Sequence, residues 1–327
     1  MPPPQKHVAI AGATGSLAPH IIAKLLRSEH TITLLTRNAS LTDYAPNLTI
    51  RTVDFISVPS LVSALKGVEV MVSCVATAAI AQQGELVEAA KEAGVRHFIP
   101  AEFGMDSTND RAGRLPVVCA AKVAVREILA NPQNGNGEEE GGGGGVVMTW
   151  TSLCNGLFLD WGLRYSFILD IGNRTAKLYD GGDVPFSATT LSDVAKAVWY
   201  IVENYDVDER VRNKVLHVQS AVVTQKQLLG IAKDVLAERG EKAEWTVERK
   251  SVEDVRKQSL ELLEGGNKED VERAVEGLCV VGSWGEGYGG CFGAKGERGN
   301  GVVGIEMLGQ DGLKGAVEGV VREFCGV

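Results

Sequence analysis

The segment His7–Ala18 constrains the fold more than any other part of the chain. A short apolar run ends in the pattern Gly-x-x-Gly-x-x-Ala and leads into a segment with apolar residues at helical spacing. This order predicts a strand, a tight glycine turn and a helix, the context in which such glycines bind a dinucleotide. Gly12 suits the turn, and Gly15 suits a close approach of the backbone to a pyrophosphate at the helix N-terminus. An ordinary strand–helix turn is the alternative.

Apolar runs alternate with helical patterns through the first half of the chain, and the alternation loosens after residue 151. It predicts a Rossmann-type α/β fold, a doubly wound parallel sheet flanked by helices. We expect an NAD(P)-binding Rossmann domain over residues 1–155. Residues 156–327 are expected to form a smaller C-terminal substrate lobe together with the last sheet strands and helices. The expected strands after the first are 31–36, 48–53, 68–74, 97–99, 146–151, 215–218 and 245–247, and the later helices are 60–65, 85–93, 119–129, 192–203, 225–237, 252–263, 269–275 and 313–324.

Two stretches are rich in glycine. Residues 133–145 are a low-complexity Gly/Glu segment, which cannot bury apolar area against its ordering entropy, and we predict a flexible loop insertion there. Residues 281–304 also contain Trp284, Tyr288 and Phe292. Aromatic residues among glycines predict an ordered loop held by packed side chains.

Composition narrows the class of partner. The formal net charge of -9 argues against a nucleic-acid-binding protein, which needs clustered Lys and Arg. No apolar stretch approaches the roughly 20 residues that span a bilayer, and the N-terminus has no signal-peptide core. The six cysteines show no metal-ligand spacing, which is typical of reduced thiols in a cytoplasmic protein. We therefore expect a monomer or homodimer that acts on a small molecule and has no metal, nucleic-acid or membrane partner.

Residues at the expected carboxyl edge of the sheet bear on the cofactor. Arg37 follows the second strand, where an arginine accommodates the 2′-phosphate of NADP and an acid would accept from the ribose of NAD. NADP(H) is therefore the favoured cofactor, and a solvated loop arginine is the alternative. No Lys or Arg follows between Asn38 and Ile50 that could add a second positive charge to the phosphate site. The fourth strand ends in the run of small residues Ser73–Thr77, which includes Val75, Ala76 and Thr77 and suits a backbone close to a cofactor or a simple strand end.

A basic pair lies on the helix after the fifth strand. Lys122 and Arg126 are spaced i, i+4 and share one helix face. A lysine beside a nicotinamide can transfer a proton, and an exposed helix pair is the alternative. Val118 occupies the position four residues before Lys122 where the usual short-chain dehydrogenases carry tyrosine, so that mechanism is excluded here. Glu102 and Asp106 are expected to be ordinary loop acids, and the five histidines form no recognisable cluster.

Taken together, these motifs resemble the isoflavone reductase-like, NmrA-like branch of the atypical short-chain dehydrogenases/reductases, and in particular its fungal CipA-like subgroup. Beyond the glycine turn, the resemblance to the family rests on Thr36-Arg37, Phe98–Asp106, Lys122 with Arg126, Thr149–Thr151, Phe158–Gly162 and Tyr179–Ser187. The resemblance to the fungal subgroup rests on Trp245–Glu248 and Gly287–Gly290. There are three departures. The family's usual Ser is Ala101 here, one basic residue of its phosphate clamp is missing, and its substrate-contacting histidine has no evident counterpart.

The resemblance implies an NADPH-dependent reductase of a small aromatic or secondary-metabolite substrate. Hydride would come from the nicotinamide, Lys122 would be the catalytic general acid or base, and Arg126 would contact NADP. The family also contains NADP(H)-sensing regulators without turnover, which is the alternative. The expected cofactor-binding residues are Gly12, Ala13, Thr14, Gly15, Ser16, Leu17, Arg37, Val75, Ala76, Thr77, Lys122 and Arg126.

Overall fold

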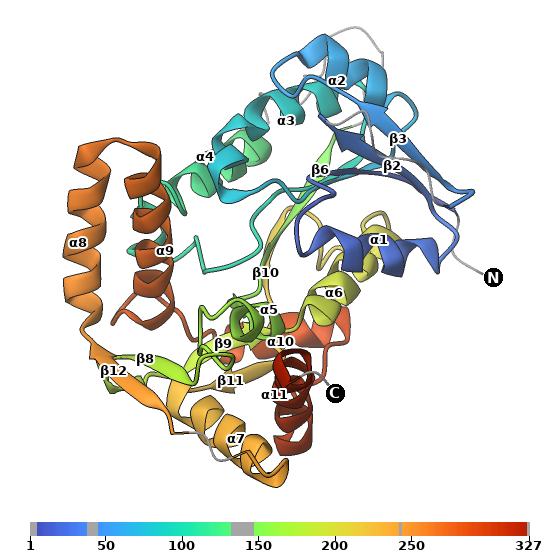
Figure 1. The fold of residues 1–327 in the computed structure, drawn as a ribbon. Coiled ribbons are helices and arrows are strands. Elements are labelled where there is room, and N and C mark those ends of the chain that lie inside the picture. The colour runs from blue at the N-terminus through green and yellow to red at the C-terminus, as the bar shows by residue number, and fades with distance from the viewer. Residues whose placement is uncertain (1–4, 38–44, 132–146, 242–243, 326–327) are drawn as a thin grey trace, which may run out of the picture. The chain divides into compact units, whose positions relative to one another are not determined.

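The computed structural model describes residues 5–37, 45–131, 147–241 and 244–325 (Figure 1). Contacts divide the chain into two compact units. The first unit contains residues 1–103, 120–153 and 195–216, and the second contains residues 104–119, 154–194 and 217–327. Both units are therefore discontinuous in sequence, whereas the predicted boundary at residue 155 separates consecutive segments. The predicted insertion at 133–145 lies outside the described residues.

The first unit is built on a sheet of seven strands in the order β10-β6-β5-β4-β1-β2-β3. The pairs from β3 through to β6 are all parallel. The strand order 3-2-1-4-5-6 is that of the dinucleotide-binding fold, in which ligands bind where the order reverses, between β1 and β4. The predicted Rossmann-type fold is confirmed. The strands are β1 His7–Ala11, β2 Thr31–Thr36, β3 Leu48–Thr52, β4 Val70–Ser73, β5 His97–Ile99, β6 Thr149–Cys154 and β10 Lys214–His217.

The helices of this unit follow from local sequence signals. In α1 (Ala18–Leu26) the residues at helical spacing, Ala18, Ile21, Ile22 and Leu25, are buried, and Pro19 lies in the first turn, where no N–H partner is lost. α2 (Val58–Leu65) is capped by Ser57, whose side chain accepts a hydrogen bond from the backbone N–H of Ser60. The other helical segments are η1 Thr77–Gln82, α3 Gln83–Glu92, α4 Ala120–Ala130 and the greater part of α6 Leu191–Asn204.

Buried histidines stabilise this unit. His97 lies between the hydroxyl groups of Thr149 and Thr151, at 2.8 Å and 2.9 Å, and stacks on Tyr205. Burial lowers the pKa of His97 to about 3, so the ring is neutral at physiological pH. His30 pairs with Glu203 at 3.1 Å. These two side chains are structural, since their ring nitrogens already have partners within the core.

The second unit contains two small sheets, β11-β9-β7 and β12-β8. Its core surrounds Trp284, which is 1% exposed and packs on Phe167, Tyr179 and Phe186. The helices α8 and α9 contact each other along a hairpin. The elements are β7 Leu157–Phe158, α5 Leu159–Arg164, β8 Thr175–Tyr179, η4 Asp180–Gly182, β9 Phe186–Thr189, β11 Ala221–Val223, α7 Gln225–Glu238, β12 Thr246–Lys250, α8 Val252–Gly265, α9 Lys268–Trp284, α10 Ala294–Val303 and α11 Gln310–Cys325, with η2 Ala112–Arg114 in the preceding loop.

The glycine-rich stretch 281–304 differs from the expected loop. Its beginning is the end of α9, and residues 294–303 form α10. The aromatic anchors are present, because Trp284 and Phe292 are both buried. The glycines instead allow close packing of a helix, since a Cβ at Gly299 would overlap the main-chain carbonyl of His217. The low helix propensity of these glycines is therefore overridden by the packing of α10 against residue 217, which is distant in sequence.

Candidate cofactor and catalytic site

The glycine loop between β1 and α1 forms the centre of the candidate site. Gly12 has a φ of +79°, and a Cβ there would overlap the carbonyl of Cys74, which follows β4. Only glycine meets both conditions. The N–H of Gly15 donates to the carbonyl of Gly12 at 3.2 Å and closes the turn. The chain therefore turns tightly from β1 into α1, directly beside the end of β4.

The outer side of this loop is open. Thr14, Gly15 and Ser16 are exposed, whereas Leu17 is 8% exposed and anchors the loop in the core. Among the described residues no side chain caps α1, and no acid lies in its first turn. The N-terminal N–H groups of α1 and their partial positive charge are thus available to an anionic ligand.

Two further predicted segments lie on the same sheet edge. The strand registers pair Ala11 of β1 with Leu35 of β2 on one side and with Ser73 of β4 on the other. Arg37, which is exposed, follows β2, and the run 75–77 follows β4. The structure therefore aligns Arg37, the glycine loop and residues 75–77 in that order along the carboxyl edge.

Lys122 extends this edge toward β5. Its helix, α4, contacts η1, the segment that follows residue 76. The Nζ atom of Lys122 donates to the main-chain carbonyl of Glu102 at 2.6 Å, and the lysine is only 7% exposed. Glu102 lies three residues after the end of β5. Gln83 of α3 stabilises the loop after β5, because its Oε1 accepts a hydrogen bond from the N–H of Ala101 at 2.9 Å. Lys122 is therefore fixed at the end of the fifth strand and is not a solvated surface lysine.

Glu102 is not the ordinary loop acid expected from the sequence. It is 1% exposed, and its Oε2 lies 3.4 Å from Nη1 of Arg126, one helical turn beyond Lys122. Its Oε1 has no hydrogen-bond partner among the described residues. Burial is tolerated because the guanidinium compensates the carboxylate charge. The basic pair and Glu102 thus form one cluster, in which a buried carboxylate oxygen remains unsatisfied.

Asp106, in the second unit, was also expected to be an ordinary loop acid, and it too is buried. It is 2% exposed, and its Oδ1 accepts from the backbone N–H of Thr108 at 3.0 Å and from its hydroxyl at 2.5 Å. Nζ of Lys295 donates to Oδ2 at 2.9 Å, and Nε2 of His217 lies 2.8 Å from Oδ1. Burial alone would raise the pKa of Asp106, but His217, Thr108 and Lys295 together hold it well below its usual range.

This second cluster also contains a histidine that sequence reasoning left unassigned. Ligand atoms of Asp106, Cys154 and His217 lie within 4.8 Å of one another, a spacing compatible with a metal ion. The carboxylate is, however, already neutralised by Lys295 and bonded by Thr108. We therefore assign the cluster a structural role as a buried ion network.

Comparison with known proteins places the chain among oxidoreductases. The sequence model of the NmrA-like family matches residues 4–132. The oxidoreductase aprR of Aspergillus flavus is 29% identical over 289 residues, which cover 87% of this chain and 89% of that protein. The isoflavone reductase homolog IRL of Zea mays is 30% identical over 227 residues, covering 65% of this chain and 68% of that protein.

The fold has counterparts among solved structures. The NADPH-dependent quinone oxidoreductase QOR2 of Escherichia coli, complexed with NADPH, aligns with a TM-score of 0.66 at 21% identity. The alignment covers 97% of this chain and 99% of the E. coli chain. Within the described part of the chain, no helix combines the length and apolar character needed to cross a membrane.

Proposed function

The chain belongs to the isoflavone reductase-like, NmrA-like family, and from this premise we propose that it is an NADPH-dependent reductase of a small aromatic or secondary-metabolite substrate. The observation that carries the proposal is the placement of Lys122. A nearly buried lysine is anchored 2.6 Å from the Glu102 carbonyl, on the sheet edge that also carries the glycine loop. Relatives named oxidoreductases support the reaction class.

The glycine loop fits a dinucleotide. The N-terminal N–H groups of α1 would bind the pyrophosphate, since no acid of the first turn competes for them. Gly15 adds a second argument. A Cβ at Gly15 would make only ordinary contacts, 3.6 Å from the Gly12 carbonyl. The packing of the fold therefore does not require glycine at this position, and a ligand approaching the backbone closely explains it.

Arg37 favours NADPH over NADH. It is exposed directly after β2, where the adenosine ribose lies in this fold, and its guanidinium can pair with a 2′-phosphate. The small residues 75–77 after β4 leave the backbone accessible on the other side of the loop. The cofactor bound in the E. coli QOR2 structure is NADPH, which supports the same choice.

When bound, NADPH supplies the hydride. The protein's own contribution is to hold and deliver a proton at Nζ of Lys122. One N–H of the ammonium group is committed to the Glu102 carbonyl, which fixes the direction of the remaining donors. Arg126, one turn away on α4, is oriented by the Glu102 carboxylate. We propose that Lys122 transfers a proton to or from the substrate and that Arg126 contributes to binding the cofactor.

A panel assay tests this function. NADPH oxidation would be followed with purified protein against phenylpropanoids, quinones and enones, with NADPH binding measured separately by fluorescence. Oxidation with one class of substrate would support the reductase. Tight NADPH binding without turnover of any compound would favour the NADP(H)-sensing alternative. Failure to bind either NADPH or NADH would overturn both.

A further inference from the structure

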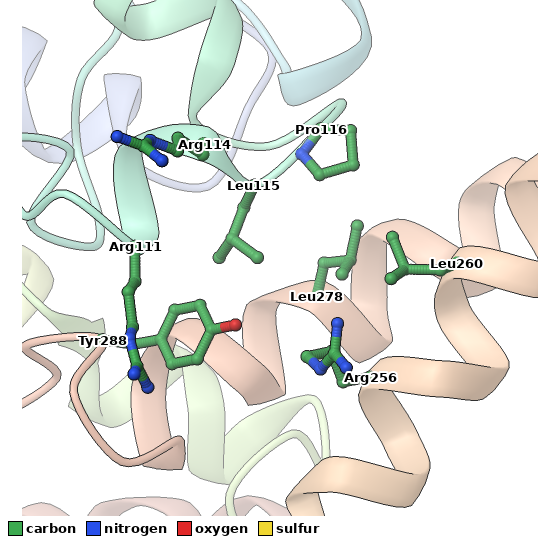
Figure 2. Close-up of a pocket in the computed structure, with 8 residues that line it drawn as sticks. All are labelled: Arg111, Arg114, Leu115, Pro116, Arg256, Leu260, Leu278 and Tyr288. Carbon is green, nitrogen blue, oxygen red and sulfur yellow. The ribbon is translucent and has the colours of Figure 1, made fainter.

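A pocket in the second unit contains none of the residues assigned to cofactor binding or to proton transfer. It has a volume of about 280 Å³ and is formed by the η2 loop, α8, α9 and the segment after α9 (Figure 2). Three of its lining residues are arginines, and none is acidic. The lining residues are Arg111, Arg114, Leu115, Pro116, Arg256, Leu260, Leu278 and Tyr288.

The positive charge of this pocket is only partly compensated. Arg256 is paired with Glu253, with two hydrogen bonds of 2.8 Å, and Arg111 donates to the main-chain carbonyl of Glu286 at 3.0 Å. The Arg114 guanidinium, in contrast, makes no hydrogen bond or ion pair with the residues that the structure describes. In a chain with a formal net charge of -9, three arginines around one cavity are a local exception that attracts anions.

The remaining lining is apolar. Leu115 and Leu278 are buried and form part of the core of the unit, and Pro116 and Leu260 add aliphatic surface. Figure 2 shows the ring of Tyr288 near Leu115, with its hydroxyl on the side of Leu278 and Arg256. This hydroxyl makes no hydrogen bond with the residues that the structure describes. One cavity thus combines guanidinium groups, an aromatic ring and aliphatic side chains.

We propose that this pocket binds a small aromatic carboxylate. Guanidinium groups pair with carboxylates through parallel N–H donors, while the leucines and Tyr288 cover a flat apolar body. Inorganic phosphate would leave the apolar wall exposed to water, and a neutral aromatic compound would form no ion pair with Arg114, which is exposed to solvent. The volume lies just below the usual 300–1,000 Å³ of ligand pockets, which favours a single ring.

This inference goes beyond the proposed reductase activity and can be tested separately from it. All eight lining residues belong to the second unit, whereas the predicted cofactor residues belong to the first. Binding can therefore be measured without NADPH and without turnover. Loss of one function would leave the other measurable.

Isothermal titration calorimetry of the full chain with trans-cinnamate tests the proposal, with cinnamyl alcohol and inorganic phosphate as reference probes. We expect cinnamate to bind at least tenfold more tightly than either reference. Arg114→Gln should weaken cinnamate about tenfold, and Tyr288→Phe about two- to tenfold, the loss of one neutral hydrogen bond. Arg298→Gln is the matched control, because Arg298 is an exposed arginine of α10 outside the lining.

Three outcomes would overturn the proposal. Equal affinity for cinnamyl alcohol would show that the arginines do not select a carboxylate. Equal affinity for phosphate would indicate a general anion site. An Arg298→Gln loss as large as that of Arg114→Gln would show that the effect is one of net charge. Circular dichroism of each variant checks that folding is retained.

Discussion

Two carboxylates that lie four positions apart, after the same strand, have different environments. Glu102 and Asp106 are both almost fully buried. Asp106, in the second unit, has contacts to both oxygens from Thr108, His217 and Lys295. Glu102, in the first unit, has one arginine at 3.4 Å and one oxygen without a hydrogen-bond partner in the described structure. Similar burial of the two acids therefore goes with different bonding of their carboxylate oxygens.

The two bonding patterns should have opposite effects on the stability of the fold. A fully bonded buried carboxylate stabilises the fold, because its charged form is favoured by every neighbour. An unsatisfied oxygen beside Lys122, the proposed proton-transfer group, costs stability, and natural proteins tolerate such costs mainly at functional sites. We therefore expect substitutions around Lys122 to affect activity and substitutions around Asp106 to affect stability.

The largest expected effect is on catalysis. Lys122→Ala should lower kcat about 10²- to 10⁴-fold, because the variant lacks the proposed general acid or base. The Kd of NADPH should change only a few-fold, since the amine acts on the substrate proton. Steady-state kinetics with a substrate from the panel and a fluorescence titration measure both quantities.

The control for this comparison is Lys66→Ala, which removes an exposed lysine at the end of α2. It should leave kcat and the Kd of NADPH unchanged. Near-full activity of Lys122→Ala would show that the lysine is a bystander and that the role implied by the family does not hold in this chain.

Asp106→Asn should have the next largest effect, on stability. Removing the charge weakens the bonds from Lys295 and Thr108, and we expect the free energy of unfolding to fall by about 2–3 kcal/mol. Urea denaturation followed by circular dichroism measures the loss. Asp110→Asn, at an exposed position of the same loop, should change the free energy of unfolding by no more than about 0.5 kcal/mol.

The stabilising effect of Asp106 should also depend on pH. Its pKa in the folded protein lies below the ordinary value of 3.8. The stabilisation is therefore fully present well above pH 3.8 and is lost as the pH falls toward the folded pKa. The difference between wild type and Asp106→Asn should be largest near neutral pH and shrink below about pH 4. A difference that stays constant down to pH 2 would contradict the proposed ion network.

Arg37→Ala should weaken NADPH binding about tenfold to a hundredfold, the loss of one charged hydrogen-bond partner of about 1.5–3 kcal/mol. NADH affinity should stay the same, because it lacks the 2′-phosphate. Paired titrations of both cofactors test this expectation, with Arg51→Ala on β3 as an exposed arginine control. An NADPH preference that survives in Arg37→Ala would place the phosphate recognition elsewhere.

Local sequence signals predicted the first unit well. The expected strand 97–99 matches β5, and the expected helix 119–129 matches α4 within one residue at each end. The glycine turn was also evident, because the φ of Gly12 and the following apolar spacing are encoded within a few residues. In parallel sheets with apolar strands, short-range patterns are sufficient.

The second unit was predicted less well. The short strands β7 and β11 contain only two and three residues, too few to show a clear alternation. The glycines of α10 indicated a loop, although the helix needs Gly299 to pack against His217 and Gly296 to pack against Gln219. Two of the partners of Asp106, His217 and Lys295, lie more than 100 positions away in sequence, so no spacing rule could find them. Such features depend on the tertiary fold.

The smallest expected effect gives the sharpest test of the comparison. Glu102→Gln keeps the shape of the side chain and the main-chain carbonyl that accepts from Lys122, and removes only the charge beside Arg126. We expect the free energy of unfolding to change by about 1 kcal/mol or less, since one carboxylate oxygen already lacks a partner and burying the charge is costly. In contrast, kcat/KM should fall about three- to tenfold, because Arg126 loses the charge that orients it.

Glu102→Asp is the matched control for that variant, because it keeps the charge and should retain more activity than Glu102→Gln at every pH. If Glu102→Gln destabilises the protein as much as Asp106→Asn while kcat/KM is unchanged, both carboxylates are structural. The unsatisfied oxygen would then mark a packing defect and not a functional site. If Glu102→Gln lowers kcat/KM while the free energy of unfolding is retained, Glu102 is functional and Asp106 is structural, as their bonding patterns predict, although both lie in the same loop.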